Sequence, residues 1–497
     1  MRRVLAVCAV FFFLLTSLGH TQSKILVKFK SNPVFEAGAL FYTFDVKSIS
    51  TFAVLPSLFE VTLKKNQNID FVLNQIRKNP HVEYAESDHR VRIIGDDDED
   101  FPFPFPWPPG DGDDGKFPFP FPWPPGDGDD DNPFPWPFPD PGEPSQPGKD
   151  PALVLDPEPI TNPKEDPDFE KTWGIQKIGS PEAWNISKGS RNVVVAVIDT
   201  GIDYNHEDLS LNVWRNVGES GEYKDEKTGE VKRRETDGID NDNNGFIDDV
   251  VGYDFANNDS LPYDDHSHGS HCSGTIGAVG MNGKGTVGVN QEVSIMGLKF
   301  LSSQGSGDIS GAIKAIDYAI KMGAKVLSNS WGDYEDSQAL RDVITEAQKH
   351  DVLFVAAAGN DSKNNDGDKP MYPASFPHEN IISVAASNEQ DRKAFFSNYG
   401  KESVDLAAPG SQIYSTVRDN KYSNFDGTSM ATPHVAGAAA LLLSIHKDLT
   451  FKELKSELLE SVDKIDVWGD KVFTGGRLNI FKAAESVLKK EKILKIF

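Results

Sequence analysis

Three polar residues stand in segments whose composition suits nucleophilic catalysis. Asp199 ends the apolar run VVVAVID, His268 lies within HSHGSHCSGTIG, and Ser429 lies within GTSMATPHVAG, ahead of a long apolar stretch. A serine hydroxyl is a weak nucleophile and needs a neighbouring base to accept its proton. Histidine suits that task because its ordinary pKa, about 6.5, is near neutral pH. A buried carboxylate can orient the imidazole, so the three segments predict a catalytic triad for acyl transfer.

Each of these residues also has a common structural role, since Asp and Ser often cap helices and single histidines are often structural. Their joint occurrence in long motifs favours catalysis. The order Asp, His, Ser along the chain differs from that of chymotrypsin-like enzymes and α/β-hydrolases. Together the motifs resemble the subtilase family of serine proteases. The resemblance implies a subtilisin-like three-layer α/β sandwich with a mostly parallel central sheet, acting as an endopeptidase on protein and peptide substrates.

The same resemblance implies further residues around the site. VLFVAAAGND places Asn360 where the family has the amide that stabilises the negative oxygen of the tetrahedral intermediate. LSNSWG at 327–332 resembles the segment that pairs with the substrate backbone. Met371 aligns with the base of the pocket for the residue before the scissile bond, which favours small or medium apolar residues there; ordinary core packing is the alternative. Some branches of the family have a cysteine at the position of Cys272. This residue is not expected to be the nucleophile, because Ser429 already occupies the nucleophile motif.

From about residue 166 the hydrophobic pattern alternates between strands and helices. Apolar runs predict buried parallel strands at 193–198, 326–327, 352–358 and 381–386. Apolar residues at helical spacing from Ile309 to Ile320 predict an amphipathic helix that ends at Gly323. This alternation favours an α/β sheet covered on both faces, and residues 166–497 are predicted to form the catalytic domain.

A small α+β unit is predicted at 24–94. Residues 25–29 and 59–63 alternate as half-buried strands do, and apolar residues that follow Asn68 share one helical face. The string VLNQIRKNPHVEYAESDH also resembles the end of the propeptide domain that precedes subtilases. This implies an intramolecular chaperone and inhibitor whose C-terminal tail lies in the active site, with autoprocessing near Ile94. An unrelated small domain is the alternative.

Residues 95–165 are predicted to be a linker. FPFPFPWPPGDGDD occurs at 101–114 and again at 117–130, and a shorter copy follows. Proline at alternate positions favours polyproline II, and the clustered Asp residues extend the chain by mutual repulsion. A spacer is favoured over a motif that binds an aromatic groove or a carbohydrate surface. We expect the precursor to be trimmed through this linker, to about Asp166.

The N-terminus, residues 1–23, has the features of an export signal. Two arginines precede an apolar run at 4–18, and small or polar residues follow. A membrane anchor is the alternative, but it needs about 20 apolar residues. No later segment is expected to approach that length, so the sequence predicts a secreted enzyme without stable membrane insertion. Cys8 would leave with the signal, and Cys272 would then have no partner for an intrachain disulfide.

The chain is strongly acidic, with 50 Lys and Arg against 76 Asp and Glu and a net charge of −26. Such a chain is a poor candidate for binding nucleic acid, whose phosphates require basic side chains. Acidic loops instead attract hard cations such as calcium. We expect a monomeric enzyme that binds structural calcium.

DGIDNDNNGFIDD at 237–249 is the strongest calcium candidate. Three oxygen-bearing residues alternate before a glycine, so that they can converge on one cation: Asp240, Asp242 and Asn244. Position 251 is Val where an EF-hand loop has Glu, so another acid, Asp248 or Asp249, must substitute. A solvated acidic turn is the alternative.

The subtilase resemblance implies a second calcium site, with Asp208 in HEDL and Asn282 in AVGMNGKG. Asn257 and Asp259 are a third possibility. Calcium would tie down surface loops of a disulfide-free exported protein and so limit self-digestion.

Two other classes of protein remain as alternatives to an active protease. A subtilase scaffold that only binds would usually lose a triad residue, whereas all three are present. A surface adhesin built on the Pro–Phe–Asp repeat would keep its binding after Ser429→Ala, whereas peptidase activity would vanish.

Overall fold

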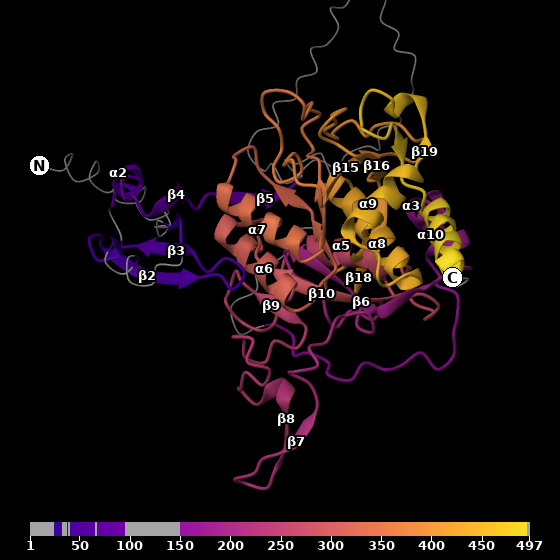
Figure 1. Ribbon diagram of the computed structural model, residues 1–497. Helices are drawn as coiled ribbons and strands as arrows, with labels where there is room; N and C mark the ends of the chain where they lie inside the picture. Colours follow the sequence, from indigo (N-terminus) through magenta and orange to yellow (C-terminus); the bar gives the residue numbers. More distant parts are fainter. Residues whose placement is uncertain (1–23, 32–36, 38–39, 65–66, 95–149, 495–497) are drawn as a thin grey trace, which may run out of the picture.

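The computed structural model of the protein describes residues 24–494, apart from 32–36, 38–39, 65–66 and 95–149. The predicted export signal and most of the predicted linker lie outside the described residues. The described chain forms a small N-terminal unit that lies against a larger α/β body (Figure 1).

The N-terminal unit contains an antiparallel sheet and helix α2 (Ile69–Ile76). The strand order is β2 (Val46–Thr51), β3 (Leu58–Leu63), β1 (Lys24–Phe29) and β4 (Val82–Ser87). The Asn68 side chain caps α2 by accepting the Phe71 N–H at 2.9 Å. The two strands and the helix predicted in this unit are therefore present.

The sheet of the N-terminal unit is covered on both faces. Ile25 and Val27 pack in the core of the unit itself, whereas Leu26 packs in a core of the larger body. β3 is consequently buried along its whole length, including Glu60, which forms an ion pair with Lys314 of the body. The half-buried alternation predicted from the sequence is lost in β3 for this reason.

The larger body is built on a nine-stranded sheet within the described residues. In spatial order its strands are β19 (Asp463–Lys464), β20 (Gly476–Arg477), β16 (Leu406–Pro409), β15 (Ile381–Ser387), β14 (Leu353–Ala357), β12 (Val326–Asn329), β6 (Gly189–Asp199), β10 (Glu292–Lys299) and β9 (Gly252–Asp254). Neighbouring strands are parallel except for β19 and β20. The four strands predicted from apolar runs are the adjacent strands β15, β14, β12 and β6.

Helices cover both faces of this sheet and make three layers (Figure 1). Val195 of β6 packs on one face and Ala196 on the other, as alternation along a strand requires. The helices on the Val195 face are α5 (His268–Gly277), α8 (Thr428–Ile445), α9 (Phe451–Glu460) and α10 (Ile480–Leu494). Those on the other face are α6 (Ile309–Lys321) and α7 (Gln338–Lys349). The predicted three-layer α/β architecture is confirmed.

Helix α8 runs through the core and carries Ser429 at its second position. In the described part of the chain it is the one helix long and apolar enough to cross a membrane, yet 89% of it is buried inside the protein. The expectation that no segment after the export signal approaches membrane-spanning length is wrong for α8. Its apolar composition is explained by its position in the core.

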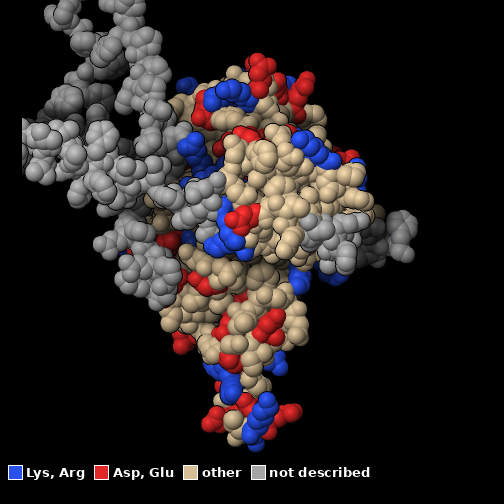
Figure 2. All heavy atoms as spheres, turned by 90° about the vertical axis from the view of Figure 1, so that its left-hand side faces the viewer, with Lys and Arg blue, Asp and Glu red and all other residues tan. Residues whose placement is uncertain are grey.

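A hairpin of β7 (Glu222–Lys224) and β8 (Val231–Arg233) projects from the lower end of the body (Figure 1). Figure 2 shows basic and acidic side chains mixed on this projection. Mixed charge is typical of a solvated surface and produces no strong field of a single sign.

Residues 150–165, the end of the predicted linker, follow the surface of the body without a helix or a named strand. Tyr204 Oη donates to Pro151 O at 2.7 Å, and Asn205 Oδ1 accepts the Val154 N–H at 2.8 Å. This segment is therefore bound to the body, unlike a free spacer.

Gly269 allows α5 to approach the end of β6 closely. A Cβ at this position would lie 2.1 Å from Gly201 O, so a side chain forces the helix to shift. We expect Gly269→Ala to lower the free energy of unfolding by roughly 1–3 kcal/mol, measured by urea denaturation. The control is Gly311→Ala on α6, where an added Cβ meets nothing closer than 3.4 Å. That variant should be neutral or more stable by up to about 1 kcal/mol. Equal midpoints for Gly269→Ala and the unmodified protein would contradict the prediction.

Candidate active site

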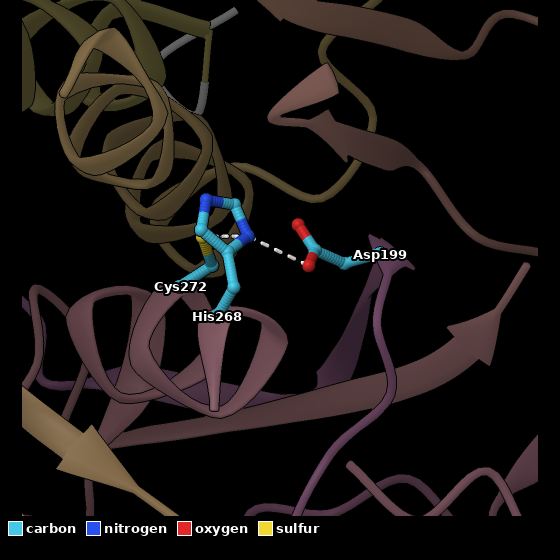
Figure 3. Close-up of side chains that lie close together, drawn as sticks. All are labelled: Asp199, His268 and Cys272. Carbon is cyan, nitrogen blue, oxygen red and sulfur yellow. Dashed lines mark hydrogen bonds and ion pairs between the residues drawn. The ribbon is translucent and has the colours of Figure 1, made fainter. Parts of the chain in front are cut away.

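Asp199 and His268 meet at the carboxyl edge of the central sheet. Asp199 is the last residue of β6, His268 is the first of α5, and His268 Nδ1 lies 2.7 Å from Asp199 Oδ1. Figure 3 shows the second ring nitrogen pointing away from Asp199. Burial disfavours the imidazolium, but the Asp199 carboxylate outweighs it and holds the pKa of His268 well above 6.5. The pair has the geometry of a base oriented by a carboxylate.

A second buried carboxylate, Asp264, fixes this pair. Its Oδ1 accepts the Thr200 hydroxyl at 2.9 Å and the Ser267 N–H at 2.8 Å, and its Oδ2 accepts the Ser270 N–H at 2.8 Å. Thr200 Oγ1 in turn accepts the Gly269 N–H at 2.9 Å. The end of β6 and the first turn of α5 are thereby tied together. Asp264 is not among the site residues predicted from the sequence, although it stands four residues before the predicted base.

Ser429 is buried, and its Oγ lies 3.1 Å from both Ile94 O and Ser330 O. His268 Nε2 has no hydrogen-bond partner among the described residues, so the predicted bond from Ser429 to His268 is not formed in this arrangement. Cys272 Sγ lies 4.0 Å from His268 Nδ1 and 3.5 Å from Ser429 O (Figure 3 shows the first contact). Ser429 and His268 thus flank one thiol, with the serine hydroxyl turned toward Ile94.

Asn360 lies on the other side of the same carbonyl group. Its Nδ2 donates to Ile94 O at 2.8 Å, and its Oδ1 accepts both the N–H and the hydroxyl of Thr428 at 2.9 Å. The bonds to Thr428 fix the orientation of the amide. Ile94 O therefore lies within hydrogen-bond distance of both Asn360 and Ser429, which is the position that a reacting carbonyl requires.

Strand β5 (Arg90–Ile93) brings Ile94 to this position. β5 pairs antiparallel with β11 (Ser306–Asp308) on one side and with β13 (Trp331–Gly332) on the other. β13 belongs to the segment 327–332 that is predicted to pair with a substrate backbone. The end of the N-terminal unit therefore lies between β11 and β13 as the middle strand of a three-stranded sheet, and we call the space between these two strands of the body the cleft.

The Ile94 side chain is buried against Ala357 and Met371, beside Tyr334. The Tyr334 hydroxyl in turn donates a hydrogen bond to the Asp361 carboxylate. Met371, predicted to lie at the base of a specificity pocket, thus contacts the residue whose carbonyl group faces Ser429. The two buried residues that pack with the Ile94 side chain are therefore apolar.

His271 and His434, which stand in the same motifs, are neutral groups within the core. His271 stacks on Phe425 with ring centroids 4.4 Å apart, and burial lowers its pKa to about 3. Burial also lowers the pKa of His434 to about 4. The pKa of the Cys272 thiol is raised by burial, which keeps it protonated and unsuited to nucleophilic attack. These environments favour His268 as the base and Ser429 as the nucleophile.

Asp208 and Asn282, predicted as cation ligands, lie together. Asn282 Nδ2 donates to Asp208 Oδ1 at 2.7 Å, and burial raises the pKa of Asp208 to about 7. Asp166 lies at the same loop and accepts the backbone N–H groups of Met281 at 2.9 Å and Asn282 at 3.0 Å. Asp166 is not among the cation ligands predicted from the sequence. Carboxylate and amide oxygens are the ligands that calcium prefers. Here the amide nitrogen of Asn282 faces Asp208 and its Oδ1 accepts the Lys284 N–H at 2.7 Å, so a calcium ion bound between these residues would require the amide to turn.

Glu219 joins Asp240 and Asp242 in an acidic cluster, in which one oxygen of each carboxylate lies within 4.8 Å of the others. Glu219 is fully buried, and its Oε2 has no hydrogen-bond partner among the described residues. Asn244, the third predicted ligand, donates its amide nitrogen to Asp242 at 3.2 Å, and its Oδ1 accepts the Phe246 N–H. The structure brings two of the three predicted ligands together and adds Glu219.

Asn257 and Asp259, the third possibility, are engaged separately. Asn257 Nδ2 donates to Asp254 at 2.8 Å, whereas Asp259 Oδ1 accepts the Leu261 N–H at 3.0 Å. Their side chains show no shared cation site.

Comparison with known proteins agrees with this geometry. Residues 190–481 match the model of the subtilase family. Thermitase of Thermoactinomyces vulgaris is 36% identical over 321 residues, which cover 64% of this chain and 98% of that protein. Subtilisin-like protease 1 of Plasmodium berghei (strain Anka) is 33% identical over 334 residues, or 64% of this chain and 54% of that protein. Thermophilic serine proteinase of Bacillus sp. (strain AK1) is 36% identical over 311 residues, or 63% of this chain and 66% of that protein.

The family match spans more than half of the chain and includes Asp199, His268 and Ser429. The chain therefore belongs to the subtilase family and is a subtilisin-like serine protease.

Proposed function

We propose that this protein is a secreted endopeptidase that hydrolyses peptide bonds through Asp199, His268 and Ser429. The observation that carries the proposal is the position of Ile94 O, 2.8 Å from Asn360 Nδ2 and 3.1 Å from Ser429 Oγ. A peptide carbonyl is thus held between a nucleophile and a hydrogen-bond donor. A scaffold that only binds peptides does not require that arrangement.

In the proposed reaction, Ser429 Oγ turns about its Cα–Cβ bond to His268 Nε2, which takes the hydroxyl proton as Oγ attacks the carbonyl carbon. Asn360 Nδ2–H stabilises the oxygen that becomes negative. Asp199 keeps a proton on His268 Nδ1 and stabilises the imidazolium. His268 then protonates the departing nitrogen, and it later activates the water that hydrolyses the acyl-enzyme.

The pocket around Ile94 supports a preference for medium apolar residues directly before the scissile bond. Ala357 and Met371 offer only apolar surface to that side chain. A Lys or Arg at this position would lose hydration without gaining a charged partner from these two residues.

We also propose that the precursor cleaves its own bond between Ile94 and Gly95, after which residues 24–94 act as an inhibitor. The support is that β5 fills the cleft and ends at Ser429. Because residues 150–165 are bound to the body, we propose that the mature enzyme begins before Asp150, rather than near Asp166.

Export is proposed from residues 1–23, whose apolar run follows two arginines. We propose a monomer whose partners are its own N-terminal unit and its protein substrates.

Structural calcium is proposed at two places. Asp166, Asp208 and Asn282 would hold one ion. Glu219 and Asp242, with Asp240, would hold another, and the buried, partnerless Glu219 Oε2 is the main support. Burying several carboxylates close together is costly unless a cation compensates them. Bound calcium would supply crosslinks between surface loops.

The first prediction from the proposed function concerns catalysis. A quenched-fluorescence peptide that contains Arg-Val-Arg-Ile-Ile-Gly, as at residues 90–95, should be cleaved after the second Ile. Ser429→Ala should abolish this activity, and Asn360→Ala should lower kcat by about 10²–10³, a magnitude known from another member of the family. Cys272→Ala is the control and should stay active. Activity that survives Ser429→Ala but not Cys272→Ala would contradict the proposed nucleophile.

The second prediction concerns pH. The raised pKa of His268 means that the protein loses its neutral base as pH falls through that value. Asp199→Asn removes the charge that raises this pKa, so the acidic limb of kcat/KM should move to lower pH, while kcat falls by about 10⁴. An acidic limb that does not move would show that Asp199 does not set the pKa of the base.

The third prediction concerns maturation. Expressed full-length protein should yield an N-terminal fragment that ends at Ile94 and a mature chain that begins between residues 95 and 150, measured by intact mass and N-terminal sequencing. Ser429→Ala should remain a single chain. A mature chain that begins after Val154 would contradict the binding of residues 150–165, and processing of Ser429→Ala in pure form would contradict autoprocessing.

The fourth prediction concerns calcium, measured on Ser429→Ala to prevent self-digestion. Calcium at 100 times its Kd should stabilise the fold by about 2.7 kcal/mol per site and raise Tm. Adding Glu219→Gln should shrink this rise, whereas Glu222→Gln on the exposed hairpin makes the same chemical change and should not. Equal calcium-induced rises in both variants would exclude Glu219 as a ligand.

A further inference from the structure

Residues 89–94 lie in the cleft as a substrate would, so their neighbours identify subsites far from the scissile bond. If Ile94 is P1, the residue directly before that bond, then Arg90 is P5 and His89 is P6. This numbering rests on the proposed function.

The P5 side chain faces a carboxylate of the body. Arg90 stands directly opposite Asp308 in the antiparallel register of β5 and β11. Directly opposed residues point to the same face of a sheet, with Cβ atoms about 4.5–5.5 Å apart. Arg90 Nη2 also donates to Ser306 Oγ at 2.6 Å, so its guanidinium lies along β11.

The Asp308 carboxylate is not used by its own helix. Asp308 is the N-cap residue of α6 but makes no side-chain capping bond there. That role is taken by Asp88 of the N-terminal unit, which accepts the Ser310 N–H at 2.8 Å. Asp308 instead accepts a hydrogen bond from Lys24 Nζ at 2.9 Å. When the N-terminal unit leaves, Lys24 leaves with it, and Asp308 then faces the residue at P5.

A second carboxylate lies at P6. Glu335, three residues after β13, has its Oε1 4.0 Å from His89 Nδ1, and its side chain is 65% exposed. Each of the two strands that border the cleft therefore has an acidic residue at its outer end. Asp308 is the last residue of β11, and Glu335 follows β13. Arg90 is exposed, whereas Val91 and Ile93 are buried. Apolar side chains thus anchor the peptide, and charge is presented only at the outer subsites.

Net charge agrees with this arrangement. Residues 24–94 carry 10 Lys and Arg against 7 Asp and Glu, whereas residues 166–497 carry 35 against 51. The one peptide that the structure shows in the cleft therefore comes from a basic unit and lies on an acidic body.

We propose that Asp308 and Glu335 form an acidic subsite that selects Lys or Arg at P5 and P6 of substrates. Exposed ion pairs are weak, so each carboxylate should change kcat/KM by roughly 1.5- to 5-fold. The enzyme then prefers basic segments that lie four or five residues before an apolar P1.

The test uses the mature enzyme, freed of its N-terminal unit, and peptides that differ only at P5. Arg, Gln and Glu are placed before Val-Arg-Ile-Ile-Gly, and mass spectrometry confirms cleavage after the second Ile. At low salt the kcat/KM ratio of the Arg peptide to the Glu peptide should be about 5 or more. High salt should reduce this ratio, because exposed charges are screened.

Variants assign the effect to residues. Asp308→Asn should at least halve the ratio, and Asp308→Lys should invert it. The matched control is Asp448→Asn, which removes an exposed carboxylate that pairs with Lys447 ahead of α9 and should leave the ratio as it was.

Each outcome is decisive. Cleavage of the Arg and Glu peptides at equal rates would overturn the acidic subsite and leave the proposed endopeptidase intact. A preference for Arg that persists in the Asp308→Asn, Glu335→Gln double variant would also overturn it. Failure to cleave any of the peptides or casein would overturn the proposed function, and the subsite with it.

Discussion

The site depends on the hydrogen bonds that the buried Asp264 carboxylate accepts. A carboxylate inside a protein is costly unless hydrogen bonds replace its hydration. Burial opposes the ionisation of Asp264, but the bonds from Ser270, from the Ser267 backbone and from nearby groups prevail and hold its pKa below its ordinary value. Because its donors belong to the end of β6 and the start of α5, the ionised group fixes strand and helix together. Asp199 and His268 receive their mutual geometry from that connection as well as from their own bond.

The N-terminal unit docks by a similar use of carboxylates. Glu86 accepts the Ser337 hydroxyl at 2.6 Å and the Gln338 N–H at 3.0 Å at the start of α7, and Asp88 binds Ser310 at the start of α6. Free N–H groups and the helix dipole favour negative charge at these ends. Because α6 and α7 lie on the same face of the sheet, the two acids orient the chain between them and direct β5 into the cleft.

The sequence predicts those features that leave a local pattern. The central strands are apolar throughout because both of their faces are buried, and the triad residues stand in long motifs. Glu219 leaves no such pattern: the hairpin of β7 and β8 separates it from Asp240, and only the fold brings their oxygens together. Likewise, residues 150–165 have the composition of a linker, yet Tyr204 binds their backbone. Contacts between distant segments are therefore what the sequence alone could not supply.

The acidic charge of the body would act both on the docking of the N-terminal unit and on the choice of substrate. Residues 95–165 carry 18 Asp and Glu against 3 Lys and Arg, and cleavage after Ile94 would leave them with the acidic body. The released N-terminal unit is basic, so long-range attraction would favour its return, most strongly at low salt. The same field would concentrate basic substrates near the cleft. If residues 24–94 act as the proposed inhibitor, they and the substrate would be attracted by the same acidic field and would bind in the same cleft. A basic substrate would then displace the N-terminal unit more readily than an acidic substrate of equal length.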